Sequence, residues 1–194
     1  MTRFLIVRHG QSEWNADGRW QGQADPPLTD LGREQAARAA RSLGGFDAIF
    51  ASPLDRAATT AAIISEELGI GPVVHMPGLM ERDAGEWSGL TRKIIDERFP
   101  GYLDQHRRPP GWESDEAVEA RVMGALERMA EQHRGGTVLV VAHGGVVYAL
   151  EAILGAPFER LANLGARWLV LTDDAWTHGE RVHLITSETV PDQI

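Results

Sequence analysis

Two continuous apolar runs in this chain each end in a histidine followed by glycine. Residues 4–7 read FLIV and lead into RHG at 8–10, and residues 137–142 read TVLVVA and lead into HGG at 143–145. Unbroken apolar runs of this length are typical of buried strands in a parallel sheet, where helices cover both faces. Parallel strands need a long crossover between them, usually a helix. These two runs therefore constrain the fold more than any other feature of the sequence.

Helical patterns separate the predicted strands. One helix is expected from Thr29, as its N-cap, to about Leu43, and another from Ser52, as its N-cap with Pro53 in the first turn, to Leu68. Further helices are expected near 91–98, 118–129 and 146–155, and further strands at 47–51, 72–76, 167–171 and 181–185. Strands that alternate with helices predict an α/β layered fold with a largely parallel central sheet.

The chain is expected to form one domain spanning residues 1–194. No linker, internal repeat or low-complexity segment divides it, and its length allows a full hydrophobic core. Residues 77–113 have glycines, prolines and few periodic patterns. An irregular stretch this long inside a compact domain usually forms a lid or a site-forming insertion.

Composition and charge exclude several classes of function. The net charge of -9 argues against general nucleic-acid binding, which needs a basic face. The absence of cysteine excludes disulfides and thiolate catalysis, and it fits a cytoplasmic location, which we take as the expectation. No apolar run approaches the roughly 18 residues of a membrane helix. The histidines other than His9 and His143 show no metal-ligand spacing, so no metal is expected. Nucleotide-binding glycine motifs are also absent, and no cofactor is expected.

The residues at the predicted strand ends indicate a phosphate site. Ligands of such sheets bind beyond the carboxyl ends of the strands, so the RHG and HGG motifs are expected at one rim. Arg56, one turn into a helix that follows another strand, can point to the same rim. Arginine forks, glycine loops and a helix start all suit a compact dianion. A structural network of arginines and carboxylates is the competing interpretation, and spacing alone does not exclude it.

Four segments of the sequence narrow this interpretation to a family. They are RHGQSEWN at 8–15, SPLDRAATTA at 52–61, LMERDAGEWSG at 79–89 and VVAHGG at 140–145. Together, over about residues 4–150, they resemble the histidine phosphatase superfamily, also called the phosphoglycerate-mutase-like fold. The resemblance implies a three-layer α/β/α sandwich with a mostly parallel central sheet. It also implies a metal-independent phosphomonoester hydrolase that acts on a small phosphorylated metabolite through a phosphohistidine.

The resemblance also implies roles for individual residues. His9 matches the nucleophile, and Glu81, in a Glu-x-x-x-Gly-x-Trp arrangement, matches the proton donor; Asp83 and Glu86 remain alternatives for the acid. The other catalytic residues, expected to hold the phosphoryl oxygens, are Arg8, Arg56 and His143. The expected substrate-binding residues are Asn15, Gln21, Gly22, Arg82 and Gly144. This chain departs from the family at Ser88, where a glutamate is frequent.

Two other functions are compatible with these motifs. A cofactor-dependent phosphoglycerate mutase would return the phosphoryl group to its product, and a silent family member would only bind phosphorylated ligands. Mutases of the family are usually longer and typically carry an asparagine soon after the second His-Gly, where this chain reads HGGVVYAL. Every catalytic position is filled, which disfavours the silent alternative. The sequence therefore favours the hypothesis that the protein is a phosphatase with a small phosphorylated substrate and no nucleic-acid or membrane partner.

Some features of the sequence leave their role open. Arg107 and Arg108 are either binders of a second anionic group of the substrate or a solvated charge run. Trp20, Trp87 and Trp112 either line a pocket mouth or pack inside the protein. The C-terminal strand pair offers an edge for a possible homodimer.

Overall fold

The computed structural model of the chain describes residues 1–173 and 175–185. At its centre is a six-stranded mixed sheet in the order β3-β2-β4-β1-β5-β6. The parallel part consists of β1 (Thr2–Arg8), β2 (Ala48–Ala51), β3 (Val73–His75) and β4 (Thr137–Ala142). The strands β5 (Gly165–Thr172) and β6 (Ala175–His183) complete it as an antiparallel pair, with β5 antiparallel to β1.

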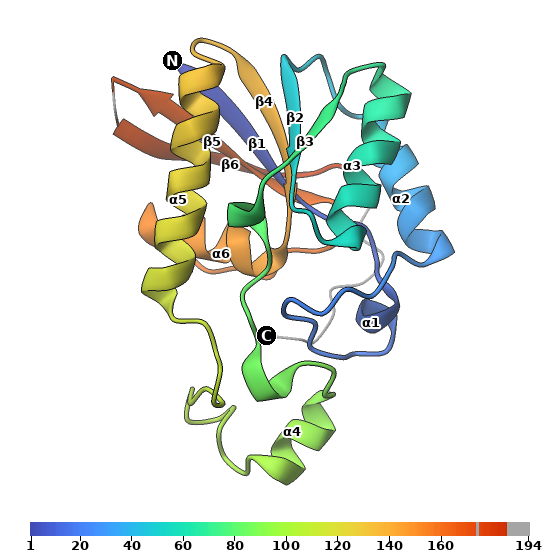
Figure 1. The fold of residues 1–194 in the computed structure, drawn as a ribbon, viewed down its shortest axis with the longest axis vertical. Helices are drawn as coiled ribbons and strands as arrows, with labels where there is room; N and C mark the ends of the chain where they lie inside the picture. Colours follow the sequence, from blue (N-terminus) through green and yellow to red (C-terminus); the bar gives the residue numbers. More distant parts are fainter. Residues whose placement is uncertain (174, 186–194) are drawn as a thin grey trace.

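Helices cover both faces of this sheet (Figure 1). On one face lie α2 (Asp30–Ala40) and α3 (Asp55–Leu68), and on the other lie α5 (Asp115–Gln132) and α6 (Gly144–Ile153). The short helices α1 (Glu13–Ala16) and α4 (Arg92–Arg98) lie beyond one end of the sheet, with a 3-10 turn at Gly85–Trp87. Another 3-10 turn, Pro77–Leu79, packs against α5. The predicted α/β/α sandwich with a mostly parallel sheet is confirmed.

The layered arrangement explains the unbroken apolar runs. Alternate side chains of a strand point to opposite faces of its sheet. In β1, Phe4 and Ile6 pack into the cluster beneath α5 and α6, whereas Leu5 and Val7 pack into the cluster beneath α2 and α3. All four are buried, so neither set of positions tolerates a polar residue.

The segment 77–113 extends beyond the sheet and carries α4 (Figure 1). It has a small apolar cluster of its own around the fully buried Trp87. Trp20 and Trp112 pack edge-on against that ring, with centroid separations of 5.2 and 5.6 Å. Trp87 is therefore a packing residue, whereas its two neighbours also face a cavity, as described below.

The predicted helix boundaries are correct at Thr29 and wrong at Ser52. The Thr29 side chain caps α2 by accepting from the Gly32 amide, although the helix ends at Ala40 rather than near Leu43. The helix α3 begins only at Asp55, without a side-chain cap, and Pro53 lies outside it. The Ser52 hydroxyl is held elsewhere, by a side chain 91 residues further along the chain.

The last two strands are longer than predicted. The expected strand at 167–171 extends over Gly165–Thr172, and the one at 181–185 begins at Ala175 and ends at His183. The strand β6 lies at the edge of the sheet, and most of its side chains are exposed or half-buried. An apolar pattern therefore marks only part of it. The expected homodimer along this edge stays a prediction.

Helices of the described residues include none that is both long enough and apolar enough to cross a membrane. The expected cytoplasmic location stays a prediction.

Candidate active site

Pairing of β1 with β4 brings the two histidine motifs together. In the parallel register Arg8 lies opposite Ala142, so the next residues, His9 and His143, leave the sheet side by side. The two imidazole rings meet edge-on, with centroids 5.2 Å apart. The His9 amide donates to the Ala142 carbonyl at 3.0 Å, which extends the sheet contact by one residue. Both strand ends therefore present a histidine at the same point of the rim, as the sequence predicts.

A short hydrogen bond fixes the orientation of the His9 ring. Its Nδ1 lies 2.6 Å from the Gly10 carbonyl oxygen. A carbonyl oxygen only accepts, so Nδ1 carries the proton and Nε2 has a lone pair. Burial, followed by the charges of Arg56 and Arg8, holds the pKa of His9 well below its ordinary value. The ring is therefore neutral at pH 7.

Arg8 and Arg56 are buried cations whose guanidinium groups are anchored to backbone carbonyls. Arg8 Nη1 donates to the Leu161 carbonyl, and Arg56 donates to the carbonyls of Ala24 at 2.7 Å and Gly22 at 2.8 Å. The Nε of each arginine has no hydrogen-bond partner in the described part of the protein. Buried donors of this kind are rare unless a ligand uses them.

His143 lies behind His9 and is fully buried. Its Nε2 is 2.8 Å from the Ser52 hydroxyl, while its Nδ1 has no partner among the described residues. Burial, followed by the charge of Arg56, holds the pKa of His143 well below its ordinary value. The Ser52 hydroxyl, predicted to cap a helix, instead orients this imidazole.

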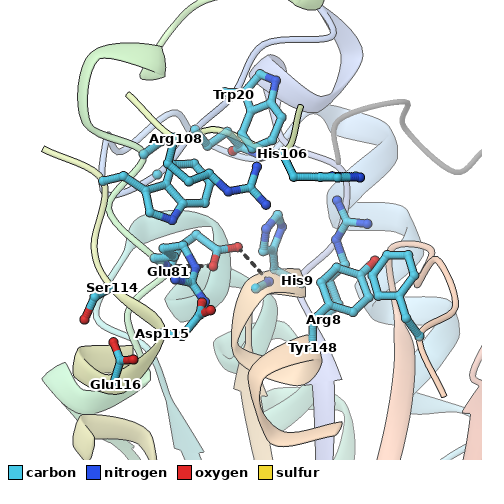
Figure 2. A pocket seen from close by; sticks show the side chains of 18 residues that line it. Arg8, His9, Trp20, Glu81, His106, Arg108, Ser114, Asp115, Glu116 and Tyr148 are labelled. Atoms are coloured by element: carbon cyan, nitrogen blue, oxygen red, sulfur yellow. Dashed lines mark hydrogen bonds and ion pairs between the residues drawn. The ribbon is translucent and has the colours of Figure 1, made fainter. Parts of the chain in front are cut away.

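Glu81 faces the start of α6. Its carboxylate accepts the Gly145 amide at 3.2 Å and the amide of Arg82 at 2.8 Å (Figure 2). A Cβ atom at position 145 would lie 2.2 Å from Glu81 Oε1. Only glycine at this position allows the carboxylate to approach the helix start.

A cavity of about 620 Å³ opens beside His9 and Glu81 (Figure 2). The predicted site residues that line it are Arg8, His9, Gln21, Gly22, Glu81, Arg82 and Gly144. Arg56 and His143 are fully buried and lie outside this lining, and so does Asn15, whose side-chain oxygen accepts from the Ser12 amide at 3.2 Å. Asp83 and Glu86 do not line the cavity. Of the three candidate acids, only Glu81 does.

Gly22 shows why this wall of the cavity needs glycine. Its φ of +51° lies in the left-handed region, and a Cβ would come within 2.7 Å of the Ala84 amide nitrogen. The nearby Ser88 hydroxyl donates to the Gln21 carbonyl at 3.2 Å. The departure from the family at Ser88 therefore affects the support of this wall.

Comparison with known proteins agrees with this geometry. The model of the histidine phosphatase superfamily (branch 1) matches residues 4–182. The chain belongs to this superfamily. A metal-independent phosphoserine phosphatase of Arabidopsis thaliana is 35% identical over 188 residues, which cover 91% of this chain and 79% of the relative. A glucosyl-3-phosphoglycerate phosphatase of Mycolicibacterium vanbaalenii is 36% identical over 199 residues, which cover 93% of this chain and 88% of that relative.

A solved structure supports the same assignment. The mycobacterial glucosyl-3-phosphoglycerate phosphatase in complex with VO3 is 32% identical, with a TM-score of 0.83 over 91% of this chain and 96% of that one. This histidine phosphatase is thus an enzyme of the phosphoric monoester hydrolase class.

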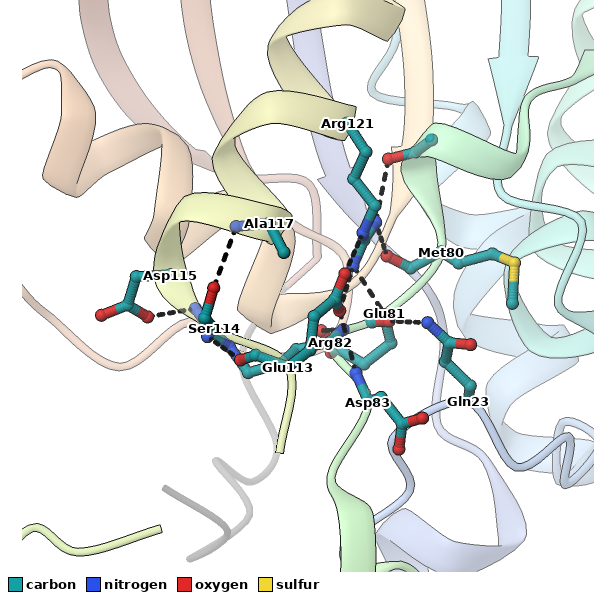
Figure 3. Close-up of polar contacts among 11 residues, drawn as sticks. Gln23, Met80, Glu81, Arg82, Asp83, Glu113, Ser114, Asp115, Ala117 and Arg121 are labelled. Atoms are coloured by element: carbon teal, nitrogen blue, oxygen red, sulfur yellow. Dashed lines mark hydrogen bonds and ion pairs between the residues drawn. The ribbon is translucent and has the colours of Figure 1, made fainter. Parts of the chain in front are cut away.

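Sequence reasoning missed the residue of this histidine phosphatase that holds the Glu81 segment. Arg121, on α5, donates to the carbonyls of Gly78 at 2.9 Å, Met80 at 2.6 Å and Glu81 at 3.2 Å (Figure 3). It also forms a bidentate pair with Glu113, at 2.7 and 2.9 Å. In the sequence Arg121 is one more polar residue on an amphipathic helix, so no signal identifies it.

Asn163 was missed for a similar reason. Its side-chain amide donates to the His9 carbonyl at 2.9 Å and to Asn15 Oδ1 at 3.3 Å. The same connection between α6 and β5 supplies the Leu161 carbonyl that anchors Arg8. These contacts span about 150 residues, and two of the three end on backbone carbonyls, which carry no residue-type signal.

Among the described residues, no group of three or more histidine, aspartate or glutamate side chains could hold a metal ion. The cationic groups of the rim, in contrast, fit an anion.

Proposed function

We propose that this chain hydrolyses small phosphomonoesters without a metal, through a phosphohistidine at His9. The observation that carries the proposal is the fixed ring of His9, which keeps Nδ1 protonated by its 2.6 Å contact with the Gly10 carbonyl. A neutral imidazole with a free Nε2 lone pair, lining a cavity among buried arginines, is the nucleophile that phosphoryl transfer needs.

The buried cations supply the electrostatic part of the mechanism. The phosphoryl group carries negative charge on its three equatorial oxygens in the transition state. The Nε atoms of Arg8 and Arg56 are buried and have no hydrogen-bond partner among the described residues, and the same holds for Nδ1 of His143. Fixed donors that meet developing charge need no reorganisation during the reaction, and they replace the metal ion of many other phosphatases.

Glu81 is proposed as the proton donor. In the first step Nε2 of His9 attacks phosphorus, the bond to the ester oxygen breaks, and Glu81 protonates the departing alkoxide. In the second step the Glu81 carboxylate accepts a proton from water, which attacks the phosphohistidine and releases phosphate. The Asp83 carboxylate instead accepts a hydrogen bond from the Gly85 amide at 2.9 Å, and Asp83 does not line the cavity. General acid-base help of this kind contributes roughly 10²- to 10⁴-fold.

Segment 77–113 is proposed as a site-forming insertion within a single domain. It supplies Glu81, Arg82, Arg108 and Trp112 to the cavity lining, while its apolar cluster holds it together. The part of the proposed domain at 174 and 186–194 lies outside the described residues.

The deciding experiment is phosphate release from a panel of phosphomonoesters in excess EDTA. The panel contains p-nitrophenyl phosphate, 3-phosphoglycerate and, from the names of the relatives, phosphoserine and glucosyl-3-phosphoglycerate. Release that is insensitive to EDTA, without isomerisation of 3-phosphoglycerate, is the expected result. Isomerisation with little release would favour the mutase, and loss of activity on chelation would contradict metal independence.

The substitution His9→Ala should reduce turnover by at least about 1,000-fold, because it removes the group that bonds to phosphorus. The backbone contacts of position 9 remain, so the variant should keep its fold by circular dichroism. His178→Ala is the matched control, since His178 is exposed on β6. Quenching wild-type enzyme in alkaline detergent during turnover of a phosphomonoester with a radiolabelled phosphoryl group should trap a base-stable, acid-labile phosphoryl group that His9→Ala lacks. Substantial turnover by His9→Ala would refute the nucleophile assignment.

A further inference from the structure

The adjacent residues Arg107 and Arg108 face different surroundings. Arg107 stacks on Tyr102, with its Cζ 4.1 Å from the ring centroid, and its Nη2 lies 3.1 Å from the tyrosine hydroxyl. Arg108 stacks on Trp112 at 4.7 Å and lines the same cavity as His9, toward which its side chain points (Figure 2). Arg107 does not line that cavity. Both arginines are exposed, but of the two only Arg108 is placed to meet a molecule bound in the cavity.

The other charged groups at the outer end of the cavity are already paired. Arg82 donates to the Glu113 carbonyl at 2.7 Å and forms an ion pair with Asp115 at 2.7 Å (Figure 3). The carboxylate of Glu116 interacts with its own backbone amide and with Ser114, and these contacts lower its pKa. Asp115 is therefore neutralised by Arg82, whereas the exposed Glu116 keeps its negative charge at the rim.

Arg108, in contrast, has no hydrogen bond or ion pair to any described residue, and its guanidinium is held by the face of Trp112. Burial, followed by the positive charge of Arg82, lowers the pKa of Arg108, while Asp115 opposes this. Both effects disfavour the charged form, and an anion bound beside the guanidinium would relieve them. A ring-stacked arginine with free planar donors matches the geometry of a carboxylate or a phosphate.

We propose that Arg108 is the specificity-determining residue of the site, and that it binds a second anionic group of the substrate while the phosphoryl group lies at His9. The preferred substrates are then phosphomonoesters that carry a carboxylate or a further phosphate, rather than phosphate esters of neutral alcohols. A cavity of about 620 Å³ has room for such a molecule between the two ends. This inference rests on the proposed phosphatase function.

The test compares two substrates that differ at one carbon. In 3-phosphoglycerate this carbon is a carboxylate, and in glycerol 3-phosphate it is a hydroxymethyl group. Steady-state kcat/KM is measured for both with wild type, Arg108→Gln and Arg107→Gln. Wild type should prefer the carboxylate by at least about tenfold, as expected for one charge-assisted pair. Arg108→Gln should reduce this preference to within about twofold, mainly by raising KM for 3-phosphoglycerate.

The control variant has the same charge change at the neighbouring position. Arg107→Gln should keep the wild-type preference, because Arg107 lies outside the cavity. Arg108→Lys keeps the charge and loses the planar fork, so its preference should be intermediate, and it serves if Arg108→Gln fails to fold.

Each other outcome has a defined meaning. An unchanged preference in Arg108→Gln, or an equal loss of preference in Arg107→Gln, would overturn this inference and leave the phosphatase function intact. Absence of hydrolysis by wild type, even of p-nitrophenyl phosphate, would overturn the proposed function and this inference with it.

Discussion

At the residue scale, the position of the Glu81 carboxylate depends on the presence of glycine, which has no side chain, at position 145. Gly145 donates its amide to the Glu81 carboxylate, and a Cβ there would come within 2.2 Å of the nearer oxygen. Real Cβ atoms do not approach an oxygen this closely, so any other residue displaces the carboxylate. Gly145 therefore allows the Glu81 carboxylate to reach the start of α6.

Gly145→Ala should consequently displace the Glu81 carboxylate and weaken its proposed role as the proton donor. We expect kcat for alkyl phosphates to fall by about 10- to 100-fold, the effect of moving a reacting group by about 1 Å. Aryl phosphates should lose much less, because a phenolate leaves without protonation. Gly124→Ala, in the middle of α5, is the control, since its Cβ would meet only the tip of Arg128 at 3.6 Å. Equal losses on both substrate types would separate Gly145 from the acid role.

At the scale of elements, α5 stabilises the loop that carries Glu81, the proposed proton donor. Arg121 joins this helix to the carbonyls of Gly78, Met80 and Glu81, and also to the Glu113 carboxylate (Figure 3). Burial opposes the charged form of Glu113, but hydrogen bonds from Arg121 and the Asp83 amide hold its pKa below the ordinary value. The loop is therefore fixed to a long helix rather than to its own short turns.

Arg121→Lys should loosen this loop without removing the positive charge. A lysine cannot reproduce the planar fork, so several of the five contacts are lost and stability should fall by about 1 to 3 kcal/mol. We expect kcat for alkyl phosphates to fall about tenfold or more, with a smaller change for aryl phosphates. Urea denaturation and leaving-group comparison measure the two effects separately. Wild-type kinetics in a destabilised variant would mean that Arg121 serves the fold alone.

At the scale of the whole molecule, the site imposes a dependence of stability on pH. His9 and His143 are buried and neutral, with folded-state pKa values well below their ordinary value of about 6.5. Between the folded and unfolded pKa values the unfolded chain binds more protons, so the free energy of unfolding rises with pH in this window. Stability is therefore lost as the pH falls below about 6.5.

Urea denaturation should reveal this dependence. From pH 7 to pH 5.5 the two histidines together should lower the free energy of unfolding by about 2 kcal/mol. His9→Ala removes one of the two groups and should show about half of this decrease. The exposed His178 provides the control, because His178→Ala should keep the wild-type slope. An identical decrease in wild type and His9→Ala would contradict the assignment of a neutral, buried His9.

The chemical identity of the site could be predicted from the sequence because its main features are local. The apolar runs of β1 and β4, with their His-Gly ends, determine buried parallel strands and place both histidines at one rim. Thr29 is a correct cap because capping involves only a few neighbouring residues. The order of four motifs was sufficient to indicate the family, which the match over residues 4–182 confirms.

The tertiary structure alone decided which of several similar residues face the cavity. Glu81 differs from Asp83 and Glu86, and Arg108 from Arg107, only in the direction of the side chain, which a loop pattern does not specify. Ser52 does not cap the helix as predicted, and its hydroxyl instead contacts His143, which follows a strand distant in the sequence. The chemical character of a motif depends on residues that are neighbours in the sequence. The orientation of each side chain depends on contacts between residues far apart in the chain, and such contacts form only when the sheet and its helices are packed.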